Sequence, residues 1–131
     1  MQTATTQGIK VTATPEYLDG QSEPNAGRYV WAYHILIENS GADTVRLLSR
    51  YWHITDARGK VEEVRGPGVV GKQPILRPGE AFRYTSGVPL ETPSGFMKGA
   101  YTMVSMASGV TFDAEIPLFS LDLPTENLRV N

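Results

Sequence analysis

The segment Gly66–Gly71 is the part of the sequence whose spacing most resembles a known chemical device. Its glycines at 66, 68 and 71 fit G-x-G-x-x-G, the pattern that binds a dinucleotide pyrophosphate where a strand leads into a helix. In that setting the N–H groups and dipole of the first helical turn hold the phosphate. Here Pro74 and Pro78 follow and prevent a helix, and Pro67 removes an N–H group from the motif itself. We therefore expect a structural turn or a protein-contacting loop at this segment.

Three basic residues, Arg65, Lys72 and Arg77, flank the glycine segment. If folding brings them together, they could contact an anion such as a phosphate. An anion- or nucleotide-binding regulatory protein is therefore the alternative hypothesis, although a small domain normally distributes such charges over its solvated surface. The formal net charge of −2 provides no general attraction to nucleic acid or to an anionic membrane, so we do not expect direct nucleic-acid binding.

The other polar residues form no catalytic or metal-ligating pattern in the sequence. His34 and His53 lie on different predicted strands and have no second ligand at metal-binding spacing. Glu62 and Glu63 would point to opposite faces of a strand, so they cannot share a proton or a metal. No serine lies in a G-x-S-x-G turn, although partners brought together only by folding stay open. The chain has no cysteine. We expect no enzyme activity, no metal and no cofactor.

Between frequent glycines and prolines, apolar residues alternate with the period of a β-strand. The clearest strand covers residues 28–39, with Tyr29, Trp31, Tyr33, Ile35 and Ile37 on one face. Residues 44–56 carry apolar side chains on both faces, which predicts a central strand covered on both sides. Further strands are predicted at residues 9–14, 60–65, 80–86, 99–108 and 110–119. This spacing predicts an all-β fold, an immunoglobulin/fibronectin type III-like antiparallel β-sandwich of about seven strands.

A chain of 131 residues is long enough for one stable domain, so we expect a single domain over residues 1–131. Its ordered core is expected at about residues 8–121, with flexible polar termini. The first residues lack the cationic flank and apolar run of a signal peptide or membrane span, and we expect a cytoplasmic protein with no membrane contact. Two long loops, at residues 15–27 and 66–78, and a shorter one at residues 88–98 interrupt the strands, and such long loops are more often functional or mobile than merely connecting.

The loops also contain the candidate protein contacts. Phe96 and Met97 lie in the predicted loop at residues 88–98, where an apolar pair suggests contact with another protein. The candidate interaction residues are Gly66, Pro67, Gly68, Gly71, Lys72, Gln73, Pro93, Phe96 and Met97. A free sheet edge is a further candidate, either for strand addition by a partner or for pairing of two copies of this chain as a homodimer.

Several motifs in this order resemble the bacterial ApaG proteins, over about residues 9–121: Leu47–Asp56, Val64–Pro74, Leu76–Glu80, Tyr84–Gly87 and Thr92–Tyr101. The resemblance implies a fibronectin type III-like sandwich. It also implies that the same domain serves in eukaryotes as the C-terminal part of certain F-box proteins and of a polymerase-delta-interacting protein, where it looks like a protein-interaction module.

For a free-standing bacterial member the resemblance implies no established reaction. Family labels mention cobalt and magnesium efflux, but the sequence offers neither a membrane span nor a ligand cluster, so any effect on cobalt or magnesium tolerance would be indirect. We therefore expect a non-enzymatic, adaptor-like module that binds another protein, whose identity the sequence does not reveal.

Overall fold

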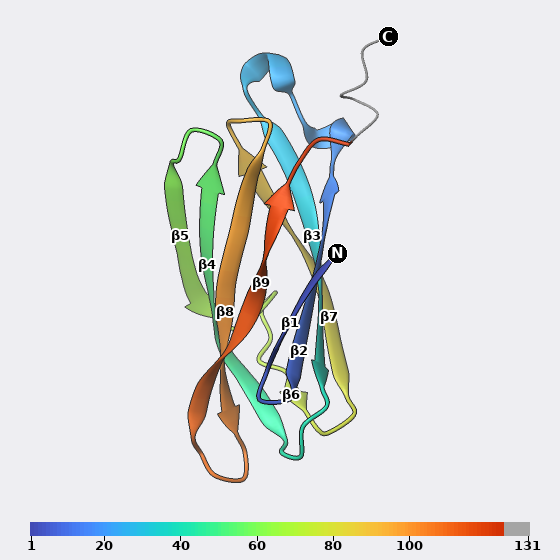
Figure 1. Cartoon of the computed structure of the whole chain (residues 1–131), viewed down its shortest axis with the longest axis vertical. Coiled ribbons are helices and arrows are strands. Elements are labelled where there is room, and N and C mark those ends of the chain that lie inside the picture. Colours follow the sequence, from blue (N-terminus) through green and yellow to red (C-terminus); the bar gives the residue numbers. More distant parts are fainter. Residues whose placement is uncertain (125–131) are drawn as a thin grey trace.

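The computed structural model describes residues 1–124, and it consists of β-strands with two short 3-10 turns (Figure 1). The strands form two antiparallel sheets, of order β1-β2-β3-β7 and β5-β4-β8-β9, with the short β6 paired to β4. The predicted all-β antiparallel sandwich is confirmed. Its elements are β1 (Gln2–Thr6), β2 (Ile9–Tyr17), η1 (Asp19–Gln21), η2 (Pro24–Ala26), β3 (Tyr29–Asn39), β4 (Val45–Asp56), β5 (Val61–Pro67), β6 (Ile75–Leu76), β7 (Ala81–Leu90), β8 (Gly95–Ser105) and β9 (Thr111–Leu121).

The core lies between the two sheets, where the inward faces of their strands meet. From β3 it receives Trp31, Tyr33, Ile35 and Ile37, as the alternation predicts. Trp52 of β4 packs edge-on against Tyr33, with ring centroids 5.0 Å apart, and against Phe119 of β9 at 6.0 Å. Large aromatic groups in such geometry bury much apolar area and fix the separation of the sheets.

A β-bulge in β4 corrects the prediction that this strand is covered on both sides. The register with β8 shifts between Leu47 and Ser49, so later residues turn to the opposite face from the one that simple alternation assigns. Leu47 before the bulge and Trp52 and Ile54 after it are consequently all buried in the same core. Leu47 on the one hand and Trp52 and Ile54 on the other, which simple alternation assigns to opposite faces, therefore lie on one face.

A second irregularity, between Met97 and Gly99 of β8, changes the alternation in β9. Simple alternation along the predicted strand would place the apolar residues at 110, 112, 114, 116 and 118 on one face. The structure buries Ala114, Ile116 and Phe119, whereas Leu118 is exposed. The extra residue in β9 explains why the pattern changes phase near its end.

The strand β1 was not anticipated, because we expected the ordered core to begin near residue 8. Gln2–Thr6 pairs with β2 through a tight turn in which Gln7 and Gly8 both have positive φ, of 48° and 82°. Thr6 Oγ1 also accepts a hydrogen bond of 3.1 Å from the N–H of Glu115 in β9. The mostly polar β1 has no apolar alternation to reveal it. Of the C-terminal residues after about 121 that are expected to be flexible, 125–131 lie outside the described part.

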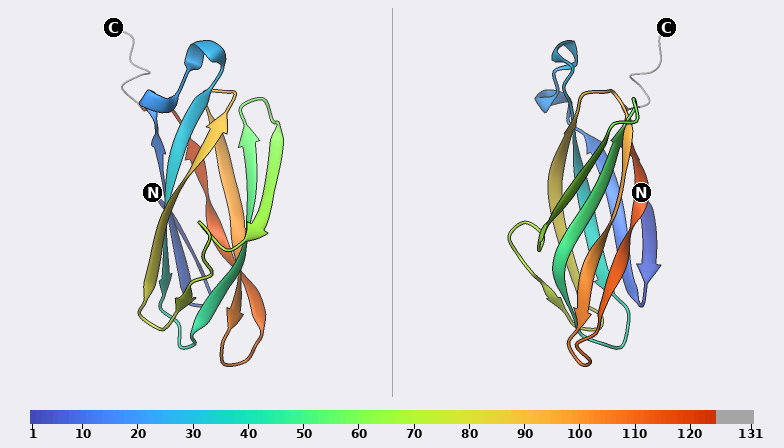
Figure 2. Two further views of the ribbon diagram at one scale, coloured as in Figure 1. Left: turned by 180° about the vertical axis from the view of Figure 1, so that it is seen from behind. Right: turned by 90° about the vertical axis from the view of Figure 1, so that its left-hand side faces the viewer.

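The two sides of the sandwich differ. On one side β1 lies against β9, as the views in Figures 1 and 2 show. On the other side the sheets end at β7 and β5, which pair with β3 and β4 respectively and with no further strand in residues 1–124. The candidate site residues lie mainly on this second side.

Candidate functional site

The glycine segment folds as a tight hairpin and not as the start of a helix. Gly66 and Pro67 end β5, and then Val69 and Lys72 exchange N–H···O bonds of 2.8 and 2.9 Å. Between them Val70 and Gly71 have φ of 44° and 78°, as in a type I′ turn. This structure agrees with the turn expected from the prolines that follow.

Two of the glycines allow close approaches inside the protein. A Cβ at Gly66 would lie 2.9 Å from Nη1 of Arg50, whose guanidinium packs against the backbone there. The same Nη1 donates hydrogen bonds of 3.0 Å to the carbonyl oxygens of Pro67 and Gly68. At Gly68 φ is 60°, and a Cβ would overlap the carbonyl oxygen of Lys72. These glycines therefore have structural reasons that require no ligand.

Replacing Gly68 with alanine is therefore expected to lower the free energy of unfolding by about 3 kcal/mol, because it adds an overlap to the cost of a left-handed residue. Gly71→Ala is the matched control, since φ is also positive at Gly71 but no atom lies within 4 Å of its Cβ position. Its expected cost is about 1 kcal/mol. Urea denaturation measures both, and equal losses would contradict the packing described for Gly68.

Three N–H groups of the hairpin, those of Gly68, Val69 and Lys72, donate to carbonyl oxygens of the protein itself. The N–H of Gly68 donates to the carbonyl of Leu48 at 2.8 Å. Gln73 Nε2 donates a hydrogen bond of 2.9 Å to the same carbonyl. Gln73 Oε1 accepts one of 3.2 Å from Nη2 of Arg46. A phosphate site needs N–H groups that are free to point at the ligand. Among these residues the hydrogen bonds instead fasten the hairpin to β4.

The basic candidates Arg65, Lys72 and Arg77 are all exposed and have separate surroundings. The Arg65 guanidinium lies 4.3 Å above the ring of Tyr51 and 3.7 Å from Glu63. Lys72 belongs to the hairpin, and Arg77 precedes β7, where its N–H donates to the Glu80 carboxylate at 2.8 Å. Within residues 1–124 no hydrogen bond or ion pair joins the three side chains. The structure gives no sign of a shared anion site.

Arg50 is the residue whose position sequence reasoning missed. Simple alternation puts it on the same face as Arg46, but the bulge turns it inward, beneath the hairpin and near the buried hydroxyls of Tyr33, Tyr84 and Tyr101. The Tyr84 and Tyr101 hydroxyls are hydrogen-bonded to each other. Burial raises the pKa of all three tyrosines, although the nearby Arg50 charge acts in the opposite direction. In the sequence, the only sign of such a bulge is a change in the phase of the apolar alternation along the strand.

The predicted contact pair Phe96 and Met97 is wrong in part. Both belong to β8, which begins at Gly95, and the alternation of a strand turns Met97 fully into the core. Phe96 is 39% exposed, and Pro93 lies in the short loop before β8. The buried Thr92 fastens this loop, since its Oγ1 accepts from the N–H of Ala57 at 3.0 Å. Only Pro93 and Phe96 of this group are available to a partner.

One hydroxyl–imidazole–carboxylate chain forms on the outer face of the first sheet. His34 contacts Thr85 Oγ1 through Nδ1 and Glu16 Oε1 through Nε2, both at 2.8 Å. The connectivity resembles that of hydrolase triads, which also need preorganised donors for an oxyanion. Here His34 is on β3, whose backbone is paired on both sides to β2 and β7.

In residues 1–124 no three acidic or histidine side chains group to hold a metal ion. No helix there has the length and apolar character to cross a membrane.

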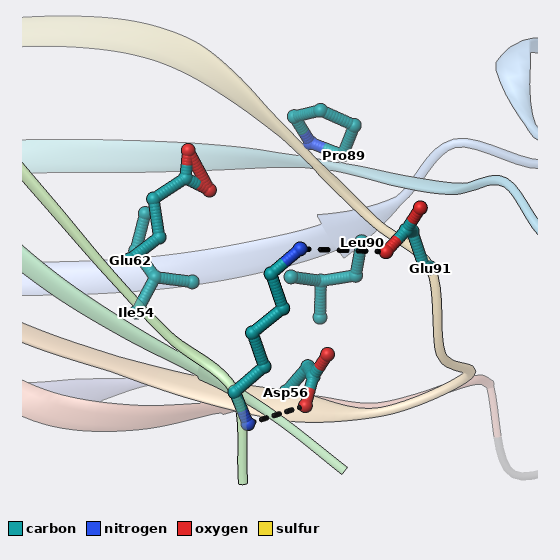
Figure 3. Close-up of a pocket in the computed structure, with 7 residues that line it drawn as sticks. Ile54, Asp56, Glu62, Pro89, Leu90 and Glu91 are labelled. Atoms are coloured by element: carbon teal, nitrogen blue, oxygen red, sulfur yellow. Dashed lines mark hydrogen bonds and ion pairs between the residues drawn. The ribbon is translucent and has the colours of Figure 1, made fainter. Parts of the chain in front are cut away.

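A hollow of about 140 Å³ lies at the upper end of the open side, between β7 and β5 (Figure 3). Its lining combines apolar and charged residues: Ile54, Asp56, Lys60, Glu62, Pro89, Leu90 and Glu91. The Lys60 ammonium lies 3.6 Å from the Glu91 carboxylate, an ion pair that Figure 3 marks with a dashed line at Glu91. None of these residues was predicted as a site, because the hollow exists only where the two sheets meet.

The fold and the hairpin define an antiparallel β-sandwich domain in which a glycine segment is fastened to an edge of the second sheet. A family model described as the ApaG domain matches residues 19–105. The chain belongs to the ApaG family. It is 60% identical over 131 residues, all of both chains, to Protein ApaG of Rhodospirillum centenum, and 60% identical over 124 residues, 95% of each, to Protein ApaG of Parvibaculum lavamentivorans.

A solved structure of similar fold is described as the putative ApaA protein of Bordetella pertussis. It has a TM-score of 0.87 and 47% identity, over 89% of this chain and 94% of that chain. A second solved structure has a TM-score of 0.84 and 45% identity, over 90% and 89%. These likenesses confirm the family resemblance and the sandwich.

Proposed function

We propose that the protein is a non-enzymatic binding module that contacts another protein through the tip of the glycine hairpin. The observation that carries this proposal is Val70, which is 55% exposed while its φ is 44°. A β-branched residue with positive φ is strained, and such strain is often retained at functional sites. Ile75, later in the same connection, is 50% exposed. Exposed apolar side chains on a well-fastened loop suit contact with a protein.

The same geometry favours protein contact over phosphate binding. The N–H groups of Gly68, Val69 and Lys72 donate to protein carbonyls, and Arg50 donates to two more. The exposed surface of the hairpin includes apolar atoms, which suit a protein partner better than an anion. Any effect on cobalt or magnesium tolerance, and a cytoplasmic location, remain parts of the proposal, with the effect arising through the partner.

Val70→Asp is expected to abolish capture of the partner from an extract of the source bacterium, because a carboxylate at the contact would be desolvated without a counter-charge. Val110→Asp is the matched control, since Val110 is 63% exposed near the β8–β9 turn. Quantitative mass spectrometry of the captured proteins measures the difference. Capture of the same proteins in equal amounts by the wild type and both variants would exclude the hairpin tip as the contact.

A further inference from the structure

The strand β7 presents a free edge on the open side of the sandwich. It pairs with β3 over its whole length and with no other strand in residues 1–124. Figure 2 shows it at the margin of its sheet. The backbone N–H and C=O groups on the outer margin of an edge strand can accept an added strand. Such an edge recognises a defined class of ligand, an extended polypeptide.

The register identifies the free groups. The N–H of Asn39 donates to the carbonyl of Glu80, just before β7, and bonded pairs alternate along an antiparallel ladder. Phe82, Tyr84, Ser86 and Val88 therefore bond to β3, whereas the residues between them turn their backbone groups outward. Pro89, which has no N–H, falls at an outward position, as expected at an edge. Arg83, Thr85 and Gly87 thus offer their N–H and C=O groups to a ligand.

The two edges of the open side differ in chemistry. The residues Glu62, Glu63, Arg65 and Pro67 occupy β5, and such residues discourage strand addition. In β7, by contrast, Arg83 is the one charged residue. The outward positions Thr85 and Gly87 have small or no side chains, which leaves the edge accessible. Strand addition is therefore favoured at β7.

The hollow of Figure 3 adjoins the C-terminal end of this edge and indicates the side chains that a ligand strand would carry. Leu90 and Ile54 supply an apolar surface. Three carboxylates, of Asp56, Glu62 and Glu91, line it together with one ammonium group, of Lys60. The excess of negative charge complements lysine or arginine on a ligand.

We propose that the free edge of β7 binds an extended peptide segment of another protein as an added strand, with apolar and basic side chains of that segment directed into the hollow. The proposal rests on the proposed function as a protein-binding module, and it names a second surface and the class of partner. Main-chain hydrogen bonds to Arg83, Thr85 and Gly87 supply affinity, and the acidic hollow selects the sequence.

The first test uses a labelled synthetic peptide of about eight residues, an ordinary strand length. Threonine occupies every second position of this peptide, and lysine or valine occupies the positions between. Gly87→Pro removes an outward N–H and is expected to weaken binding about tenfold or more, the loss of a hydrogen bond and its geometry. Gly87→Ala retains the N–H and is expected to bind normally, because its Cβ would lie 3.6 Å from the nearest atom, the Trp31 carbonyl oxygen. Fluorescence anisotropy measures both, and circular dichroism checks the fold.

The second test examines charge. Glu62→Lys is expected to weaken binding of the peptide several-fold. Glu115, an exposed residue on β9, provides the control, because Glu115→Lys changes the net charge of the protein equally and is otherwise expected to change binding little. A peptide with glutamate in place of lysine is expected to bind far more weakly than the lysine peptide. Amide chemical shifts should change along residues 81–90 when the lysine peptide is added.

Absence of binding, equal binding by the Gly87 variants, or shifts confined to another surface would each overturn the proposal. Dimerisation of the wild type that Gly87→Pro abolishes would identify a second copy of the chain as the occupant and would also overturn it. Val70→Asp is expected to bind the peptide like the wild type. If the peptide does not bind but Val70→Asp still loses its captured protein, only the β7 proposal is contradicted. The proposed function as a protein-binding module then stands.

Discussion

Replacing Gly99 with alanine is expected to remove a large part of the stability of the folded protein. Gly99 lies in β8, between β4 and β9, in the interior of the second sheet. An added Cβ would overlap the carbonyl oxygen of Tyr51, and it would lie 3.3 Å from Cδ1 of Ile116. The first neighbour is backbone of a paired strand, which cannot move without breaking the ladder. We expect a loss above about 4 kcal/mol, a large part of the 5–15 kcal/mol that stabilises a typical domain.

Far-UV circular dichroism and urea denaturation measure this effect. Gly87→Ala is the matched control in another strand, because no atom lies closer than 3.6 Å to its Cβ position. Its expected change is within about 1 kcal/mol, the span of strand propensities. Unfolding of Gly99→Ala at the same urea concentration as the wild type would mean that the Tyr51 carbonyl of β4 does not lie against Gly99 of β8 as described.

The sequence predicted what depends on local alternation and on turn residues. The inward face of β3 followed from Trp31, Tyr33, Ile35 and Ile37 at every second position, because period two is a geometric property of a strand. The rejection of a helix after Gly71 followed from Pro74 and Pro78, which block helical backbone directly. The structure agrees at both places. The all-β sandwich could therefore be predicted before any coordinates.

Features that depend on long-range pairing could not be predicted in this way. The bulge near Leu48 inverts the phase of β4, and it turns the half-buried Arg50 to the same face as Trp52 and Ile54. The turn residues Thr92–Gly95 predict that Met97 lies in a loop, although β8 starts at Gly95. The hollow between β5 and β7 combines residues that are distant in sequence. A single sequence contains no direct record of which strands meet.

The buried tyrosines beside Arg50 lead to the second large effect, a steep loss of stability at alkaline pH. Burial raises the pKa of Tyr33, Tyr84 and Tyr101 above the ordinary value of 10.0. Below about pH 10 these hydroxyls are protonated in both the folded and the unfolded state. The contribution of the three tyrosines to the free energy of unfolding is then fully present. Above it the unfolded chain releases protons that the folded protein retains, and the free energy of unfolding falls. Each tyrosine contributes up to about 1.4 kcal/mol per pH unit until its folded pKa is reached.

Urea denaturation at several pH values between neutral and strongly alkaline measures this slope, and near-ultraviolet absorbance reports tyrosinate. Tyr101→Phe is expected to cost about 1–3 kcal/mol at neutral pH, because the Tyr84 hydroxyl loses its buried partner. Replacing both residues with phenylalanine should cost less than the sum of the single losses, since neither hydroxyl is then left unpaired. The double variant should also show a shallower alkaline slope. A slope equal to that of the wild type would mean that these two tyrosines ionise in the folded protein as readily as in the unfolded chain.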